Sequence, residues 1–278
     1  MDPPLRSNGS NTRPVIQAPT RSIGRSRVVG RVDRVLNTAL AGERAAVLNA
    51  TAAELLAEPV PVARVIEIAL ERPGVGVIGH WMIQELFRRS GLYDDLLNAL
   101  ASPDAGTRAA AARLCAAARL TDSVLWIGDL LEDEEPQVRD AAVRALAQLG
   151  GRRSVELLMA SAERIPLYRL AIALARGASD VDIEALMRQP ASERAAVATV
   201  LACGLRRDVL RVQPLLGIAH DRRWPNQVRV AACKALATIG DRSAVGGLSR
   251  LAEADPDPLM KKAGERAHRR LVKRTVGK

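Results

Sequence analysis

Aromatic side chains are almost missing from this sequence: Trp, Tyr and Phe together make up 2% of its 278 residues, against an apolar content of 48% that Ala, Leu and Val dominate. Aromatic residues favour β-strands, whereas Ala and Leu are strong helix formers. No segment shows the sustained alternation of apolar and polar residues that a half-buried strand would have. The composition therefore predicts an all-α protein.

Cysteine is also scarce. Cys115, Cys203 and Cys233 lie far apart in different predicted helices, and no CxxC pair occurs. An odd number of separated cysteines argues against a disulfide framework and offers no zinc-ligand spacing. We expect the three thiols to be small buried side chains in a protein of the reducing cytoplasm.

Long apolar runs are absent as well. No stretch of about 18 uncharged apolar residues is available to cross a membrane, and no apolar core of a secretory signal follows the N-terminal arginines. Residues 1–27 are polar and rich in proline, which predicts a disordered basic N-terminal arm. We expect a soluble protein whose folded part spans residues 28–273, with a basic C-terminal tail at 274–278.

The positive charge of the chain is concentrated at its two ends. Residues 1–34 carry +5 and residues 258–278 carry +7, whereas residues 35–257 carry −2, which gives the net charge of +10. A protein that follows a nucleic-acid backbone along its length would carry Lys and Arg throughout its body. Contact with nucleic acid or an anionic membrane is therefore expected only through the basic ends.

One segment recurs and organises the rest of the chain. Residues 133–150 combine an acidic turn and a proline with a Val-Arg pair and an alanine-rich helix that ends at Gly-Gly. The same order returns at 221–240 and, more loosely, at 104–118 and 255–271. The Arg of the Val-Arg pair, or the residue in its place, marks successive units at positions 79, 108, 139, 169, 194, 229 and 261, in steps that average about 30 residues. A repeat of this length indicates a stack of similar units.

The spacing of apolar residues predicts what each unit is. Apolar positions recur at intervals of three and four and are interrupted by Pro, Gly or Asp, as expected for helices. The sixteen predicted helices, or eight hairpins, span 28–40, 43–57, 61–71, 75–89, 92–101, 104–119, 121–132, 135–149, 152–161, 165–176, 180–188, 191–204, 208–219, 224–239, 242–253 and 256–273. One hairpin cannot cover its own apolar face, but stacked neighbours can, so the chain is predicted to be an α-solenoid.

The pattern Asp-x-x-x-x-Val-Arg-x-x-Ala-x-x-Ala-Leu-x-x-Leu-Gly at 133–150 resembles a HEAT repeat, in particular the short HEAT-like repeats of the phycobilin-lyase type. The resemblance covers roughly residues 60–273. It implies a right-handed superhelix of about eight stacked hairpins. Pro166, Pro190 and a step of 25 residues depart from the pattern near 165–205, where we expect a local kink. HEAT repeats serve many roles, so the resemblance implies a fold and not a function.

A column of arginines marks the start of the second helix in successive repeats. These side chains could line a groove for an acidic partner, or they could bond the preceding turn and the neighbouring repeat. Acidic residues, including Asp133 and Asp255, occupy those turns. We therefore favour a structural arginine ladder. Its members are Arg108, Arg139, Arg169, Arg194 and Arg229.

A second column lies five residues after the first, on the polar face that also holds Asp140 and Gln148. Polar faces of second helices usually form the concave wall of such a superhelix. The middle members, Leu174 and Thr199, are not basic, so an ordinary solvated face is the alternative interpretation. The predicted partner-binding stripe consists of Gln84, Arg113, Arg144, Lys234 and Arg266.

The sequence offers no set of residues for catalysis. His80, His220 and His268 fall in different repeats, and HExxH, GxSxG and the P-loop are all missing. The glycines at 74–79 fit GxGxxG by letter, but no strand precedes them as a dinucleotide fold requires. Base-flipping enzymes gather aromatic side chains at one groove, whereas the three tryptophans here lie in separate repeats. No catalytic residue, cofactor or metal site is predicted.

These observations predict a non-catalytic protein–protein interaction scaffold or adaptor that binds a protein partner on the concave face of a HEAT-repeat solenoid. One alternative is an enzyme or chaperone of the bilin-lyase type, which would need a deep apolar pocket lined by His, Tyr or Arg. The other is a HEAT-like nucleic-acid-binding protein that contacts phosphate through its basic ends. The sequence does not predict the oligomeric state.

Overall fold

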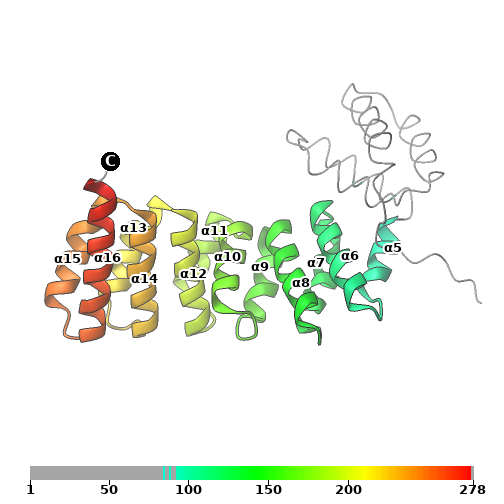
Figure 1. The fold of residues 1–278 in the computed structure, drawn as a ribbon, viewed down its shortest axis with the longest axis horizontal. Helices are drawn as coiled ribbons and strands as arrows, with labels where there is room; N and C mark the ends of the chain where they lie inside the picture. The colour runs from blue at the N-terminus through cyan, green and yellow to red at the C-terminus, as the bar shows by residue number, and fades with distance from the viewer. Residues whose placement is uncertain (1–83, 85–87, 89–91, 277–278) are drawn as a thin grey trace, which may run out of the picture. The chain divides into compact units, whose positions relative to one another are not determined.

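The computed structural model describes residues 84, 88 and 92–276 of the chain. From Tyr93 onward the chain forms one compact unit (Figure 1). The predicted N-terminal arm at 1–27 and the first four predicted helices lie outside the described residues, except that Gln84 and Arg88 are helical. The domain boundaries at 27 and 273 therefore stay predictions.

Every regular element within residues 92–276 is helical, so the all-α prediction is confirmed for this part of the chain. The helices match the last twelve predicted ranges to within four residues at each end. They are α5 Leu92–Leu100, α6 Ala105–Ala117, α7 Val124–Asp129, α8 Pro136–Leu149, α9 Gly151–Ala160, α10 Leu167–Gly177, α11 Asp180–Arg188, α12 Glu193–Arg206, α13 Val212–His220, α14 Asn226–Ile239, α15 Val245–Ala254 and α16 Pro258–Val276.

Among the helix starts, the largest differences from the predicted bounds lie at α7, α13 and α15. A short 3-10 turn precedes each of them, at Thr121–Ser123, Val209–Arg211 and Arg242–Ala244. In two cases an aspartate side chain caps that turn: Asp208 accepts from the Leu210 amide at 3.1 Å and Asp241 from the Ser243 amide at 2.8 Å. The capped turn is tighter than an α-helix, so the α-helix itself begins three or four residues later than predicted.

Most helix ends follow from residue types that the sequence displays. The Asp104 carboxylate caps α6 by accepting from the Thr107 amide at 2.7 Å, and Ser179 forms a capping box with Asp182 at the start of α11. Gly240 ends α14 at a φ of 84°, which is unfavourable for residues with a side chain. These caps fix where each hairpin turns.

The second helices of the hairpins form a continuous series, in which α6 packs on α8, α8 on α10, and so on through α12, α14 and α16 (Figure 1). Their core is mostly Ala, with Leu and Val between. At Gly204 on α12, an added Cβ would lie 2.8 Å from the Cα of Ala235 on α14, so this glycine allows close approach of the two helices. The α-solenoid prediction is confirmed for this unit, while the right-handed superhelix and the kink near 165–205 stay predictions.

Candidate functional site

The second helices share a common register when positions are counted from the first residue of each helix. Residue four is Arg108 in α6, Arg139 in α8 and Arg229 in α14. In contrast, Arg169 is residue three of α10 and Arg194 is residue two of α12. These two ladder members therefore stand one or two residues nearer to the start of their helices than the first three.

Arg108 ties the start of α6 to the next repeat. Its Nε and Nη2 atoms donate to the two carboxylate oxygens of Asp133 at 2.7 and 2.9 Å. Its Nη1 also donates to the backbone carbonyls of Ser102 and Pro103 at 2.8 and 3.0 Å. The hydrogen bond from Arg108 lowers the pKa of the Asp133 carboxyl below its ordinary value, although burial acts in the opposite direction.

Arg229 repeats this arrangement in a more buried setting. It donates to the Ala219 carbonyl at 3.0 Å, to the Asn226 side chain, and to the carboxylate of Asp255. Only 3% of Arg229 and 7% of Asp255 are exposed. Burial raises the pKa of Asp255, but the Asp257 amide and Arg229 outweigh it, so the net shift is downward. The pair holds the α13–α14 turn to the α15–α16 turn.

Arg139 and Arg194 bond backbone carbonyls only. Arg139 Nη1 donates to the carbonyls of Asp133 and Glu134, both at 2.7 Å. Arg194 donates to the carbonyls of Ala162 at 2.8 Å and Ile165 at 2.6 Å, which belong to the turn of the preceding hairpin. Both guanidinium groups therefore satisfy carbonyls that the turn leaves without a helical partner.

Arg169 differs from the other ladder members because its side chain is 52% exposed and pairs with Asp140 of α8. Asp140 also pairs with Arg144, a member of the predicted stripe. Arg144 and Arg169 thus share the single negative charge of Asp140.

The predicted stripe coincides with the ninth residue of the second helices. Arg113, Arg144, Lys234 and Arg266 are all ninth residues, and all four are exposed. The ninth residues of α10 and α12 are Ala175 and Leu201, which are half-buried. Gln84 is helical and half-buried, but it lies outside the compact unit that begins at Tyr93.

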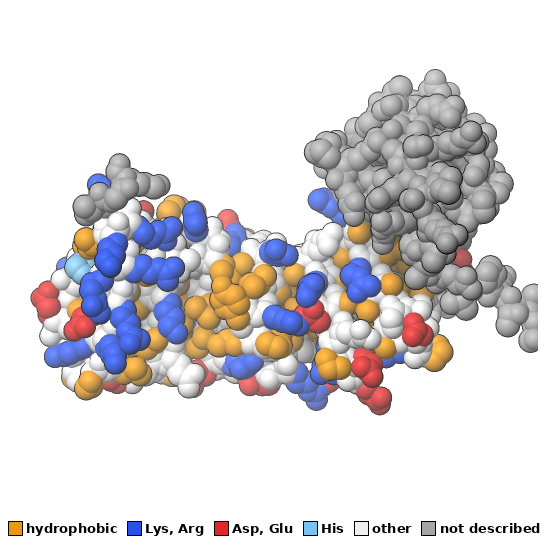
Figure 2. Space-filling model, viewed as in Figure 1, with side chains coloured by type: hydrophobic (Ala, Val, Ile, Leu, Met, Phe, Trp, Pro, Cys, Tyr) orange, Lys and Arg blue, Asp and Glu red, His pale blue; other side chains and the backbone are white. Residues whose placement is uncertain are grey.

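We call the side of the array that carries these residues the second-helix face. Its ninth-position residues, from α6 to α16, are Arg113, Arg144, Ala175, Leu201, Lys234 and Arg266. Leu174 and Thr199, which the sequence placed in the second column, are the eighth and seventh residues of their helices and are fully buried. In Figure 2, Lys and Arg side chains gather over α14 and α16, and apolar side chains gather next to them over α10 and α12. The face is therefore basic at one end and apolar in its middle.

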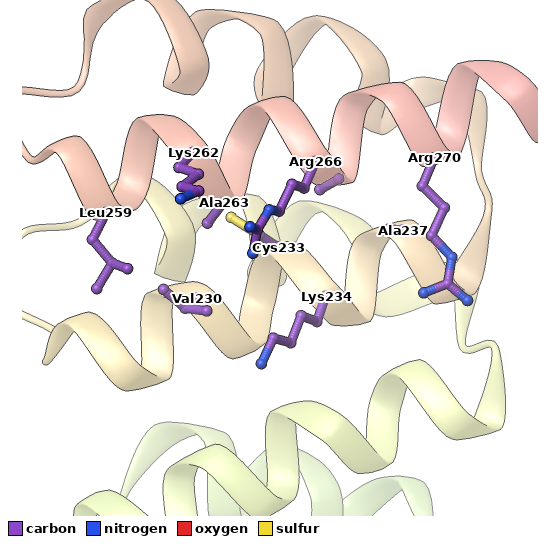
Figure 3. A pocket seen from close by; sticks show the side chains of 10 residues that line it. Val230, Cys233, Lys234, Ala237, Leu259, Lys262, Ala263, Arg266 and Arg270 are labelled. Atoms are coloured by element: carbon purple, nitrogen blue, oxygen red, sulfur yellow. The ribbon is translucent and has the colours of Figure 1, made fainter.

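A groove of about 420 Å³ lies between α14 and α16 on this face (Figure 3). It joins two stripe residues, Lys234 and Arg266, to two basic residues of α16 that the sequence analysis did not single out, Lys262 and Arg270. The signal was present in the sequence, because residues 262, 266 and 270 are spaced by four and so share one side of a helix. The remaining lining residues are apolar: Val230, Cys233, Ala237, Leu259, Ala263 and Ala267.

The part of the chain that the structure describes offers no group of side chains arranged for metal binding and no activated cysteine nucleophile. No cluster of three or more His, Cys, Asp or Glu residues able to hold a metal ion occurs within these residues. His220 lies with Nε2 3.0 Å from the Gly247 carbonyl, and His80 lies outside the described residues. Burial raises the pKa of the Cys115 and Cys203 thiols to about 11 and that of Cys233 to about 12, so all three are protonated at neutral pH.

None of the helices within residues 92–276 has both the length and the apolar character needed to cross a membrane.

The geometry defines an α-solenoid of stacked helical hairpins joined through arginines at their turns. Within this class, residues 93–176, which include α6 to α9, match the family model of HEAT repeats. The resemblance found in the sequence is thereby confirmed over these residues. No curated protein matches the chain.

Several solved structures are similar in fold. One is human deoxyhypusine hydroxylase in complex with glycerol, with 16% identity, coverage of 90% of this chain and 98% of that chain, and a TM-score of 0.34. Another is the complex of CpcE and CpcF of phycocyanin lyase from Nostoc sp. PCC7120, with 18% identity, coverage of 76% and 89%, and a TM-score of 0.34. A third is an engineered protein, with 18% identity, coverage of 89% and 97%, and a TM-score of 0.30. Likeness at this level carries no conclusion about activity.

Proposed function

We propose that this protein is a non-catalytic interaction scaffold of the cytoplasm that binds a protein partner on its second-helix face. The HEAT-repeat fold is compatible with such a role. The observation that carries the proposal is the make-up of this face. Lys234, Lys262, Arg266 and Arg270 of α14 and α16 form no ion pair among the described residues, and they adjoin apolar side chains over α10 and α12. Protein interfaces combine an apolar centre with a polar rim, and arginine is enriched in them.

The arginine ladder differs from the second-helix face in the contacts that its side chains make, and this difference supports the assignment. Arg108, Arg139, Arg194 and Arg229 bond turns within the solenoid, so their contacts are already used for stability. Lys234 and Arg266 make no ion pair within the described residues. Cations that form no ion pair among the described residues are available to the carboxylates of a partner.

The test is an affinity pull-down from native lysate with the full chain as bait. The wild-type bait is compared with a second-helix variant that combines Arg113→Glu, Arg144→Glu, Lys234→Glu and Arg266→Glu. A matched control reverses four exposed arginines on first helices, Arg152→Glu, Arg153→Glu, Arg188→Glu and Arg250→Glu. Both variants change the net charge equally. Each also breaks exposed ion pairs, Arg144–Asp140 in one and Arg152–Glu156 and Arg188–Glu184 in the other, which contribute about 1 kcal/mol or less each.

We expect the wild type and the control to retain the same protein in near-stoichiometric amount, and the second-helix variant to lose it. Circular dichroism establishes that both variants are folded. Equal capture by all three baits would contradict the proposal. Recovery of nucleic acid alone, released by salt and indifferent to the variant, would assign binding to the basic ends of the chain instead.

A further inference from the structure

We infer that the groove between α14 and α16 binds an acidic, amphipathic segment of another protein. This inference rests on the proposed function and specifies which part of the second-helix face makes the contact and which chemistry it recognises.

The charge of the groove points to an anionic ligand. Lys262, Arg266 and Arg270 extend from α16, with Arg266 directed toward α14, and Lys234 extends from α14 (Figure 3). Residues four apart on a helix are separated by about 6 Å along its axis, so the three α16 cations form a row about 12 Å long. Within the described residues, none of the four lining cations is paired with a carboxylate.

The floor of the groove points to a ligand that is also apolar. Six of its ten lining residues are apolar, and most of them are small: Cys233, Ala237, Ala263 and Ala267. Small side chains leave room between the helices for a larger apolar side chain from a partner. Leu259 at the end of the groove is 53% exposed, so it adds an accessible apolar side chain to the floor. A segment with carboxylates on one side and apolar residues on the other satisfies both features.

Nucleic acid fits the groove less well. Proteins that bind single strands place aromatic side chains under the bases, and none of the ten lining residues is aromatic. An apolar floor gains nothing from a sugar-phosphate backbone. The chain's own N-terminal residues 1–34 carry +5 and would be repelled by the four cations.

The groove is also distinct from the other basic part of the face. At α8, the Asp140 carboxylate pairs with both Arg144 and Arg169, so an acidic segment would meet a carboxylate beside these arginines. The same ligand meets only cations between α14 and α16.

The experiment measures binding of a fluorescein-labelled synthetic peptide to the full chain by fluorescence anisotropy. The peptide is a helix former of about 16 residues with Glu on one side and Leu on the other. A second peptide has the same composition in an order that mixes the two sides. An oligothymidylate of about 20 nucleotides is the nucleic-acid probe. The variants are Lys262→Glu/Arg270→Glu, Leu259→Ser, and the control Arg152→Glu/Arg153→Glu on α9.

We expect the segregated peptide to bind the wild type and the control equally, and to bind more weakly when NaCl rises from about 50 to about 300 mM. Lys262→Glu/Arg270→Glu should weaken binding by about tenfold or more, because two attractions become repulsions. Leu259→Ser should weaken it several-fold without a change in charge. The mixed peptide and the oligothymidylate should bind more weakly than the segregated peptide.

Three results would overturn the inference. The first is failure of the segregated peptide to bind, or equal binding by the groove variant and the control. The second is tighter binding of the oligothymidylate that Leu259→Ser does not change. The third is a wild-type dimer in light scattering that Lys262→Glu/Arg270→Glu dissociates, which would make a second copy of the chain the occupant. If the peptide fails while the pull-down still depends on the second-helix residues, the proposed function stands and only this inference falls.

Discussion

Replacing Arg229 with Met tests the energetic role of the arginine ladder. Methionine keeps much of the aliphatic volume of arginine but removes the three hydrogen bonds to Ala219, Asn226 and Asp255. The change also leaves the Asp255 carboxylate buried without its cationic partner, with the Asp257 amide at 3.0 Å still donating to it. The matched substitution is Arg169→Met, because Arg169 belongs to the same predicted column but is half exposed.

The two substitutions should differ several-fold in their effect. Removing one partner of a buried ion pair costs about 3 to 5 kcal/mol, because the remaining charge stays desolvated. Removing one partner of an exposed pair costs about 1 kcal/mol or less. Asp140 in addition keeps Arg144 when Arg169 is lost, which reduces that cost further.

Urea unfolding followed by circular dichroism gives the two free-energy changes. Hydrogen exchange by mass spectrometry locates them, since repeats in a solenoid open locally. We expect Arg229→Met to lower the unfolding free energy by several kcal/mol and to speed exchange in α13 to α16. Equal losses for Arg229→Met and Arg169→Met would refute the argument that burial decides the contribution of each ladder member.

Three further predictions concern single residues. The pKa of Asp133 is lowered in the folded protein, so its contribution to stability is complete above the unfolded-state pKa of about 4 and is lost as the pH falls through the folded-state pKa. Asp133→Asn should therefore flatten the dependence of the urea midpoint on pH below about 4, and an unchanged slope would contradict this. Because all three cysteines are buried, no thiol of the native protein should react promptly with Ellman's reagent at neutral pH, whereas all three should react in urea; one fast thiol in the native state would refute it. Gly204→Ala places a methyl group against the Ala235 backbone and should cost about 1 to 3 kcal/mol, whereas Gly217→Ala, with open space around it, should be neutral or stabilising by up to about 1 kcal/mol; equal thermal shifts would show that α12 and α14 can separate freely.

Helix positions could be predicted from the sequence wherever a single residue type determines an end. The predicted range 180–188 coincides with α11, because Ser179 and Asp182 have the letters and spacing of a capping box. Helix starts at prolines are less certain. Pro136 and Pro258 are the first residues of α8 and α16, whereas Pro166 and Pro225 precede α10 and α14. Proline suits both positions, so it fixes a helix start only to within one residue.

An error of one residue in a helix start changes which side chains are assigned to a column. Aligning the repeats by their Arg residues placed Arg169 and Leu174 in the two columns, but α10 begins at Leu167. The residues that occupy the fourth and ninth positions are Leu170, which is buried, and Ala175. Leu174 lies one residue, a rotation of about 100°, before the ninth position of α10, and Thr199 lies two residues before that of α12. Both are buried, so the middle of the predicted column points into the core.

The groove between α14 and α16 could be predicted only in part. The sequence shows that residues 262, 266 and 270 share one side of a helix, and it shows the net charge of +7 for residues 258–278. It does not show that α16 packs beside α14, so that Lys234 joins these residues across an apolar floor. That arrangement depends on contacts between segments about 30 residues apart. The repeat predicts that such neighbouring helices pack together, but it does not predict the groove that forms between them.

The most direct test of the central claim is site-specific photo-crosslinking in native lysate. Benzoylphenylalanine replaces Lys273, which is exposed on the side of α16 that carries the groove cations, in one full-length protein and Arg250 on α15 in another. The account predicts that the first protein forms an adduct with a single protein partner, that the adduct is lost when Lys262→Glu and Arg270→Glu are added, and that the second protein forms none. Adducts that form equally at both positions, or only at position 250, would contradict the claim that the second-helix face is where this protein binds its partner.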